Sequence, residues 1–381
     1  MRKDSPTVWD SANPTLRAGE IGYAWDSSDS ASLGRIKIGD GTSAWTQLAY
    51  FYSSGDSAGL YSSGGGSSAT WYGDRGLRGG GYAASGGSLL GATNVIDYWD
   101  ITTTSNSTDF GDLTVARYYP KGASDGTYGT FPGGNDDTGD KDQIDYVTIA
   151  TTGNATDFGD LTFAKSGMNA SCNGTYALYA GGYHSSVTNN IGYYTPATPG
   201  NASNFGDLVS TRNDPSSFAD ATYVLFNGGR SYSGTYLTSM DYVTASTPGN
   251  ASDFGDLTQA RRDCAGASNA TIGFTAAGNP GGSSASSPWQ RSQTIDYTTI
   301  QTPGNATDFG DLTRFTRHSA ACANATRGTI IMGYPREGDG SYSISNSIEY
   351  ITIASPGNAT DFGDLSAHGV YSMGSCSGAA S

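Results

Sequence analysis

The residues of this chain that could carry chemistry are its few histidines, its cysteines and its many carboxylates. The three histidines, His184, His318 and His368, fall at unrelated positions, and no serine or cysteine nucleophile lies at a motif spacing from them. Acyl transfer needs a base beside its nucleophile, so we expect no enzyme activity and no cofactor. Paired carboxylates that cleave glycosidic bonds stay open as an alternative, because a closed fold can bring distant acids together.

Metal ligands are also poorly arranged. The chain has four cysteines, at Cys172, Cys264, Cys322 and Cys376. No histidines accompany them at ligand spacing, so we expect four free, mostly buried thiols and no metal site. Aspartates three residues apart, as in Asp157 and Asp160, could in principle bind calcium. Without a DxDxDG loop, turn capping is the simpler interpretation.

Arginine and aromatic side chains are better candidates for function, because they are enriched at binding hot spots and stack on sugars. Seven of them lie in connections between expected strands, where recognition residues are usually found. These candidate contact residues are Arg230, Tyr232, Tyr236, Trp289, Arg291, Arg336 and Tyr342. The alternative for any one of them is that it merely covers a neighbouring part of the fold.

The elements that must position these residues are repeats. Six tyrosines are each followed twelve residues later by a phenylalanine, and the pairs recur every 47 to 55 residues. The pairs are Tyr98 and Phe110, Tyr146 and Phe158, Tyr193 and Phe205, Tyr242 and Phe254, Tyr297 and Phe309, and Tyr350 and Phe362. Such a period is typical of a propeller or a solenoid. We predict that each phenylalanine packs between units, since no other kinase motif accompanies its Asp-Phe-Gly or Asn-Phe-Gly context.

Each repeat has the pattern of a four-stranded antiparallel meander. In the third unit we expect strands at 165–171, 175–180, 191–195 and 204–209. With 55 glycines, 25 tyrosines, low charge and no helical run, the whole chain is predicted to be all-β. The repeat region opens at a second strand and ends after a first strand. We therefore predict a six-bladed β-propeller at 73–381, closed by pairing 367–378 with 74–80, where a solenoid would need polar caps.

The repeats differ mainly in the connection between their second and third strands. These connections lie at 83–94, 135–143, 184–190, 230–239, 279–294 and 335–347. In an antiparallel meander they emerge on the same face as the crossings between units. One face of the predicted ring is therefore diversified, and the seven candidate residues belong to it.

The charge balance excludes two classes of partner. The chain has 20 basic and 35 acidic residues, a net charge of −15. Nucleic acid and anionic lipid both require a basic surface, so we expect neither as a partner. No apolar run follows Arg2 and Lys3, and no stretch approaches membrane-spanning length, so we expect no signal peptide and no membrane insertion.

Residues 1–50 have a different pattern from the repeats and are joined to them by a Ser- and Gly-rich linker at 51–72. Their segments NPTLRAGEIGY, GRIKIGDGTSAW and LAYF resemble the small N-terminal β-prism module of many bacteriophage tail fibres and of the phage major tropism determinant. The match covers about the first 50 residues and departs from the module in a longer loop at 25–32. The resemblance implies attachment to a virion and a homotrimer.

The repeats have a resemblance of their own. Their order of glycine doublet, tyrosine and later aromatic residue resembles a kelch blade, with phenylalanine where kelch has tryptophan and a longer final hairpin. This resemblance implies a kelch-like propeller topology and says nothing of kelch function.

These expectations combine into one functional hypothesis. We expect a bacteriophage virion protein, a tail fibre or receptor-binding adhesin on an external appendage, that presents variable propeller loops to a host-surface glycan or protein. Its expected partners are two further copies of the chain and, through residues 1–50, other virion proteins. A capsid decoration or head-fibre protein is the first alternative, and a glycan-degrading enzyme is the second.

Overall fold

The computed structural model describes residues 72–85, 88–281, 291–335, 343–366 and 369–380, together with Thr15 and four short strands before residue 52. It divides into two compact units, Met1–Ala69 and Thr70–Ser381. Every regular element among the described residues is a β-strand, which confirms the all-β prediction. No described segment forms a helix that could span a membrane.

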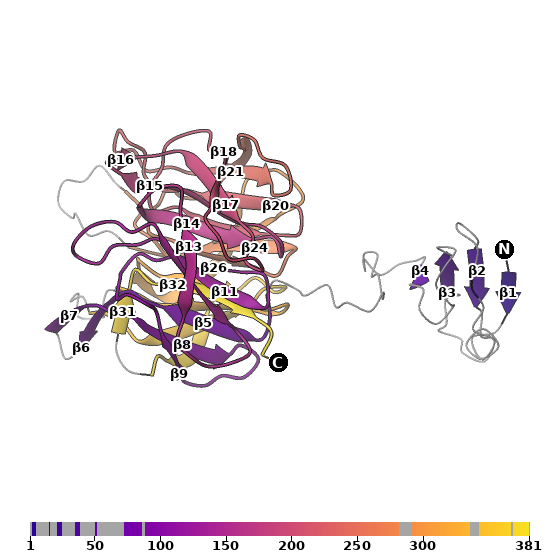
Figure 1. Ribbon diagram of the computed structural model, residues 1–381, viewed down its shortest axis with the longest axis horizontal. Helices are drawn as coiled ribbons and strands as arrows, with labels where there is room; N and C mark the ends of the chain where they lie inside the picture. Colours follow the sequence, from indigo (N-terminus) through magenta and orange to yellow (C-terminus); the bar gives the residue numbers. More distant parts are fainter. Residues whose placement is uncertain are drawn as a thin grey trace. The chain divides into compact units, whose positions relative to one another are not determined.

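The first unit contains one four-stranded sheet (Figure 1). Its strands, in sheet order, are β1 (Arg2–Asp4), β2 (Ile21–Ala24), β3 (Arg35–Ile38) and β4 (Tyr50–Phe51). β1 is parallel to β2, whereas the other neighbours are antiparallel.

Six sheets of the second unit each have a path of four antiparallel strands, and one further sheet has three strands. Sheet 1 has β32 (Gly374–Gly378), β5 (Arg75–Gly79), β8 (Val95–Asp100) and β9 (Thr108–Asp112). Sheet 2 has β10 (Ala123–Ser124), β11 (Tyr128–Pro132), β12 (Gln143–Thr148) and β13 (Thr156–Asp160). Sheet 3 has β14 (Ser166–Cys172), β15 (Ala177–His184), β17 (Asn190–Tyr194) and β18 (Ser203–Asp207), with β16 (Ser186–Val187) beside β15.

The remaining three sheets repeat the same order. Sheet 4 has β19 (Ser216–Ala219), β20 (Tyr223–Asn227), β21 (Ser239–Thr244) and β22 (Ser252–Asp256). Sheet 5 has β23 (Ala265–Ser268), β24 (Ile272–Ala276), β25 (Ser292–Thr299) and β26 (Thr307–Thr316). Sheet 6 has β27 (Ala320–Ala323), β28 (Arg327–Ile331), β29 (Ser347–Thr352) and β30 (Thr360–Asp364).

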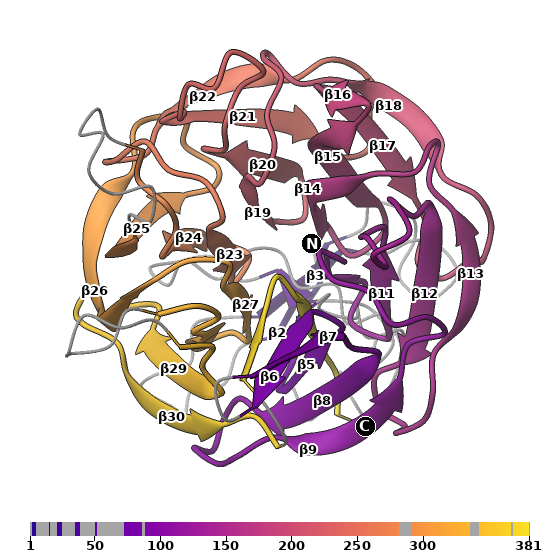
Figure 2. The ribbon, with the colours of Figure 1, turned by 90° about the vertical axis from the view of Figure 1, so that its left-hand side faces the viewer.

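The six sheets surround a common axis, with the first-named strand of each innermost (Figure 2). Neighbouring innermost strands contact one another in the cyclic order β10, β14, β19, β23, β27, β32 and back to β10. Sheet 1 joins the two ends of the repeat region, because β32 pairs with β5 from Gly374 opposite Gly79 to Gly378 opposite Arg75. The two ends of the repeat region therefore complete one sheet together, and this pairing closes the ring.

One connection differs from expectation. The segment predicted as a loop at 83–94 contains the hairpin of β6 (Tyr82–Ser85) and β7 (Ser88–Ala92). β31 (Gly369–Tyr371) pairs with β6 in a separate three-stranded sheet, so 369–371 does not pair with 74–80 as predicted. The turn between β5 and β6 explains the difference, because Gly80 and Gly81 have φ of 63° and 113°, which glycine adopts readily.

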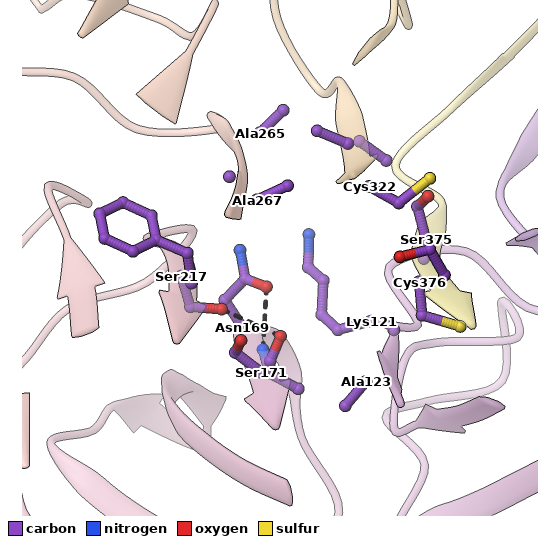
Figure 3. Close-up of a pocket in the computed structure, with 18 of the residues that line it drawn as sticks. Lys121, Ala123, Asn169, Ser171, Ser217, Ala265, Ala267, Cys322, Ser375 and Cys376 are labelled. Carbon is purple, nitrogen blue, oxygen red and sulfur yellow. Dashed lines mark hydrogen bonds between the residues drawn. The ribbon is translucent and has the colours of Figure 1, made fainter. Parts of the chain in front are cut away.

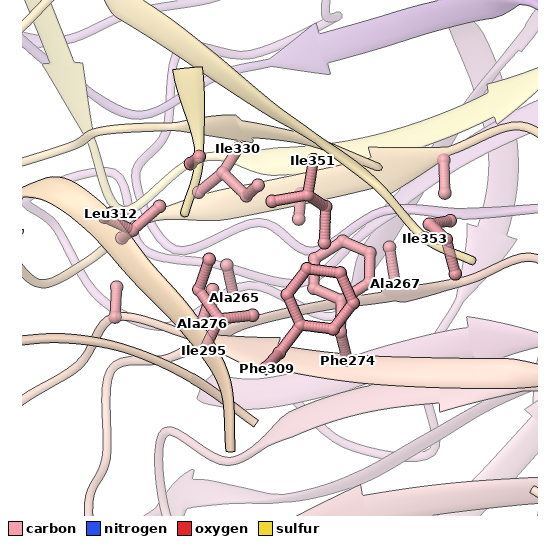
Figure 4. Close-up of a cluster of buried hydrophobic side chains, with 14 of the residues drawn as sticks. Ala265, Ala267, Phe274, Ala276, Ile295, Phe309, Leu312, Ile330, Ile351 and Ile353 are labelled. Carbon is pink, nitrogen blue, oxygen red and sulfur yellow. The ribbon is translucent and has the colours of Figure 1, made fainter. Parts of the chain in front are cut away.

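The repeated tyrosines and phenylalanines form the core between sheets. In all six sheets the paired rings meet edge to face, with centroids 5.6 to 6.0 Å apart. Each phenylalanine also packs against the following sheet; Phe309 of sheet 5 joins Ile351 and Ile353 of sheet 6 in one buried cluster (Figure 4). The prediction that these phenylalanines pack between units is confirmed.

Asparagines tie each sheet to the one before it. In six equivalent places an asparagine Oδ1 accepts a hydrogen bond of 3.0 to 3.1 Å from an aspartate N–H of the preceding sheet. The pairs are Asp112 to Asn154, Asp160 to Asn201, Asp207 to Asn250, Asp256 to Asn305, Asp311 to Asn358, and Asp364 to Asn106. The last pair links sheet 6 to sheet 1, so this series of bonds also closes on itself.

A β-bulge recurs just before each of the six tyrosines. In sheet 2 the bulged position is Asp145, which accepts hydrogen bonds from the N–H and the hydroxyl of Thr114 at 2.9 and 2.7 Å. The guanidinium of Arg117, in the crossing that enters the sheet, lies 3.1 Å from the same carboxylate, and both side chains are fully buried. Sheets 4 and 5 have the same pair, as Arg212 with Asp241 and Arg261 with Asp296.

Candidate functional site

Four of the seven predicted contact residues can be placed in the structure. They are Arg230, Tyr232, Tyr236 and Arg291. Trp289, Arg336 and Tyr342 lie outside the described residues.

Arg230, Tyr232 and Tyr236 share the connection between β20 and β21. The backbone of Arg230 forms bridges with Asn213 and with Tyr236, and its Nε donates to the carbonyl of Gly234 at 3.2 Å. Tyr232, in the same connection, is 74% exposed. This connection is ordered by its own hydrogen bonds and presents one aromatic ring to solvent.

Arg291 has a different environment from the one that we expected for a contact residue. It is 7% exposed, and its Nε donates to the carbonyl of Tyr334 at 2.6 Å. Its guanidinium carbon lies 4.5 Å from the centroid of the Tyr334 ring. Arg291 therefore packs against Tyr334. Its contact with a ligand stays a prediction.

Exposed apolar side chains concentrate on one face of the ring. Among the described residues, seven large hydrophobic residues are exposed: Leu89, Leu90, Val115, Tyr183, Val209, Tyr232 and Phe315. Each lies in a connection between second and third strands, in a crossing between sheets, or at the strand end that leads into one of these. Both kinds of connection emerge on the face predicted to be diversified, because the strands alternate in direction.

At the centre of this face, the crossings place one residue of each sheet around the axis. These six axial positions are Tyr119, Gly167, Asp214, Asp263, His318 and Ser372, and all have φ between 53° and 61°. Five backbone hydrogen bonds join them in sequence, for example from Asp263 N–H to the Asp214 carbonyl at 2.9 Å and from Tyr119 N–H to the Ser372 carbonyl at 2.6 Å. Residues other than glycine adopt this conformation at a cost, which the five consecutive bonds help to offset.

The axial positions gather opposite charges in a confined space. Burial and the neighbouring Asp263 carboxylate raise the pKa of Asp214 to about 7. Burial alone would raise the pKa of Asp263, but His318, Arg262 and other nearby cations outweigh it, so that this pKa is lowered. Arg262 lies 3.4 Å from the Asp214 carboxylate and 3.6 Å from that of Asp263.

His318 completes this group without adding charge near neutral pH. Its Nδ1 lies 3.3 Å from Asp263 Oδ1. Burial lowers the pKa of His318 to about 4, and the positive charges of Arg317, Arg262 and Lys121 contribute to the shift. At pH 7 the axial group therefore combines one ionised aspartate, one half-protonated aspartate and a neutral imidazole.

Four tyrosines pack together beside the axial residue His318. Tyr82 packs against Tyr118 and Tyr371 with centroids 5.5 and 5.4 Å apart, and Tyr371 stacks on Tyr334 at 5.7 Å. The His318 ring lies 5.6 Å from Tyr371. We refer to Tyr82, Tyr118, Tyr334 and Tyr371 as the tyrosine cluster. Flat aromatic faces beside carboxylates and arginines are the side-chain types that bind sugar rings and peptide side chains.

The described residues contain neither a group of metal ligands nor an exposed thiol. No three histidine, cysteine, aspartate or glutamate side chains are grouped there so as to hold a metal ion. All four cysteines are buried, as predicted. Burial raises the pKa of Cys264 to about 12 and that of Cys322 to about 11, so these thiols stay protonated and unreactive at neutral pH.

Our reading of the sequence missed the axial positions and the tyrosine cluster. The signal was present, because five of the six axial residues stand nine residues after the repeated phenylalanine and the sixth stands ten after it. The residue type at this offset varies among the units, whereas the Phe-Gly-Asp-Leu at the start of the same segment is identical in all six. Sequence alone could not reveal that these positions meet, since they belong to separate sheets.

Neither a protein-family model nor a curated protein sequence matches this chain. Its function must therefore be argued from its own residues and their arrangement.

Proposed function

We propose that this chain is an external virion protein of a bacteriophage, a tail fibre or receptor-binding adhesin. In this proposal residues 73–381 are a six-bladed kelch-like β-propeller. Residues 1–50 are a trimerising β-prism that attaches the chain to the virion, joined to the propeller by the linker at 51–72. The diversified face binds a glycan or protein on the host surface.

One observation carries the binding role, which is that the exposed apolar side chains are one-sided. All seven exposed large hydrophobic residues among those described belong to the connections and crossings of the diversified face, or to the strand ends that lead into them. A surface with apolar side chains gathered on one face is typical of a protein that binds another molecule there. A purely structural protein would not require its exposed apolar side chains to lie on one face.

The mechanism in this proposal is multivalent attachment. Three copies tied together by residues 1–50 present three faces to one host surface. When one face is bound, the linker holds the other two near further receptors, so that weak single contacts combine into durable attachment.

The glycan-degrading alternative would use the Asp214 and Asp263 pair, whose pKa values are pushed apart as in an acid and base couple. However, Asp214 is 8% and Asp263 is 6% exposed. Glycosidase carboxylates lie roughly 5 to 10 Å apart with a sugar between them. A buried, ion-paired couple offers no such space, so the geometry favours binding over hydrolysis.

Binding of the labelled full-length chain to host cells tests the proposal. We expect Tyr232→Ala and the double variant Leu89→Ser with Leu90→Ser to weaken binding about tenfold or more, the effect of losing a hot-spot side chain. Thr151→Ala, at an exposed turn between third and fourth strands, is the matched control and should bind like the unchanged protein. Absence of cell binding together with labelling of the phage head would establish the decoration role instead, and shortened host polysaccharide would establish the enzyme.

A further inference from the structure

A cavity lies on the axis of the ring, between the innermost strands (Figure 3). Its volume is about 80 Å³, and all six sheets contribute to its walls. A single water needs roughly 10 to 15 Å³ of such space, so the cavity has room for a group several atoms in size. Short side chains line most of it, including Ser171, Ser217, Ala267 and Ser375.

Lys121 is the one long cationic side chain in this lining. It stands two residues after the axial Tyr119, and the five equivalent residues are all shorter and neutral: Asn169, Ser216, Ala265, Ala320 and Gly374. The side chain of Lys121 extends toward the middle of the cavity, past Asn169 (Figure 3). Four of these short residues, Asn169, Ala265, Ala320 and Gly374, line the cavity and leave free the space into which the amino group points.

The amino group of Lys121 has no counter-ion in contact. Among the described residues no hydrogen bond or ion pair of its Nζ is formed, and its nearest ring contact is with Tyr119, at 6.0 Å from the centroid. The Lys121 side chain is half-buried, and an ammonium held partly out of water without a partner is costly. Burial accordingly lowers the pKa of Lys121, although Asp214 and Asp263 pull in the opposite direction.

The charges near Lys121 are of both signs. Arg262 and Arg317 act on the same axial group as Asp214 and Asp263, and His318 is neutral near pH 7. Asp214 and Asp263 both raise the pKa of Lys121, but the pKa of about 7 for Asp214 leaves this carboxyl only partly ionised. Protonation of Asp214 removes one negative charge that would oppose an anion beside Lys121.

We propose that the axial cavity binds one small oxyanion of the sulfate or phosphate class, with Lys121 as its main ligand. A bound oxyanion supplies the missing counter-ion of Lys121 and contacts strands from several sheets at once. Because such an anion binds only the closed ring, it stabilises the fold increasingly as its concentration rises above its dissociation constant. This proposal does not depend on the proposed function.

Isothermal titration of the full-length chain with sodium sulfate tests the proposal, with ionic strength held constant by sodium gluconate. We expect one saturable site per chain and a rise in the unfolding temperature. Lys121→Met keeps the apolar stem but removes the charge and should weaken binding at least about tenfold, as for loss of a charged hydrogen bond. Lys121→Arg keeps the charge and should retain binding.

Lys141→Met is the matched control, since Lys141 is a surface residue paired with Asp136 at 2.8 Å. It removes the same charge from the chain and should bind sulfate unchanged. Sulfate stays dianionic across neutral pH, so binding should tighten from pH 8 to pH 6 as Asp214 takes up a proton. If Lys121→Met does not fold, Lys121→Gln replaces it.

Three results would overturn the proposal. They are the absence of saturable heat with the unchanged protein, equal binding by the folded charge-free variant, and an equal loss in the Lys141 control. The last result would show that sulfate responds only to net charge.

Discussion

Sheets 2 and 3 are neighbours with the same strand order, yet they use different side chains to accept the same backbone hydrogen bond. In both, a threonine N–H of the crossing from the preceding sheet's fourth strand needs a buried acceptor. Sheet 2 supplies Asp145, which also pairs with Arg117. Sheet 3 has Gly192 at the aspartate position and Lys165 at the arginine position.

A tyrosine hydroxyl replaces the carboxylate in sheet 3. The Thr162 N–H donates to Tyr179 Oη at 3.0 Å, and the two hydroxyls lie 3.1 Å apart. Glycine is required at 192, because a Cβ there would lie 2.2 Å from the Tyr179 hydroxyl. The comparison teaches that the fold needs a hydrogen-bond acceptor at this bulge, whereas the ion pair is one way among several to provide it.

The replacement leaves Lys165 without an acidic partner among the described residues. Its Nζ donates to the Gly181 carbonyl at 3.2 Å and lies 4.3 Å from the centroid of the Phe163 ring. Burial lowers the pKa of Lys165 to about 7. Sheet 2 therefore contains a matched pair of buried charges, and sheet 3 contains a buried amine that favours its neutral form.

The largest effect is expected from breaking the pair in sheet 2. Arg117→Met leaves the Asp145 carboxylate buried without its cation, which costs about 3 to 5 kcal/mol. Urea unfolding of the variant beside the unchanged protein measures this loss. Lys141→Met, whose charge lies at the surface, should change stability by less than about 1 kcal/mol; an equal loss in both variants would contradict a special role for the buried pair.

Lys165 of sheet 3 should make the stability of the chain depend on pH near neutrality, an effect that we do not expect from the ion pair of sheet 2. Because the pKa of Lys165 is about 7 in the fold and 10.5 in the unfolded chain, the fold holds fewer protons between these values. Its contribution to stability therefore rises with pH in this window, by at most about 1.4 kcal/mol per unit, and is lowest below pH 7. Urea unfolding from pH 6 to 9 should show a steeper rise for the unchanged protein than for Lys165→Met.

Replacing the residues of sheet 3 by their equivalents from sheet 2 tests the comparison further. Gly192→Asp alone forces a side chain against Tyr179 and should destabilise the chain by about 1 to 3 kcal/mol. The triple variant Lys165→Arg, Tyr179→Phe and Gly192→Asp reproduces the residues of sheet 2, whose equivalent of Tyr179 is Phe131. Thermal unfolding should show that the triple variant recovers most of the loss, and a triple variant weaker than Gly192→Asp would refute the equivalence.

The smallest effect concerns the asparagines on either side of sheet 2. Asn154→Ala and Asn201→Ala each remove one bond between neighbouring sheets and should cost about 0.5 to 1.5 kcal/mol. Since the two bonds are equivalent, urea unfolding should give equal losses within about 0.5 kcal/mol. If the two losses of stability differ by more than this, the substitutions in sheet 3 also affect the bond between sheets 2 and 3.

Much of the fold was predictable because it depends on local pattern. Alternating apolar residues and glycine turns indicated four strands per unit, and in the third unit the expected strand at 191–195 matches β17 (Asn190–Tyr194) within a residue. The constant spacing of Tyr146 and Phe158 reflected a contact within one hairpin, which sequence separation preserves. The expected loop at 83–94 failed as a prediction because its partner strand, β31, comes from the far end of the chain.

The candidate site was only partly predictable. Tyr232 was correctly placed in an exposed connection, whereas Arg291 is buried against Tyr334. Whether an arginine in a connection faces solvent depends on which neighbouring connection folds over it. That neighbour belongs to another sheet, so no spacing within the unit can identify it.

The sequence by itself determined that this chain is a set of repeated β-meanders with a shared hairpin core and unequal connections, because strand alternation and turn residues act over a few positions. Only the tertiary structure decided which residues meet on the axis. Tyr119 and Ser372 lie near opposite ends of the repeat region, and their hydrogen bond exists only because β32 pairs with β5. The position of Lys121 in the axial cavity and the sharing of charge between Asp214 and Asp263 have the same cause, since a closed ring converts equivalent positions in separate sheets into immediate neighbours.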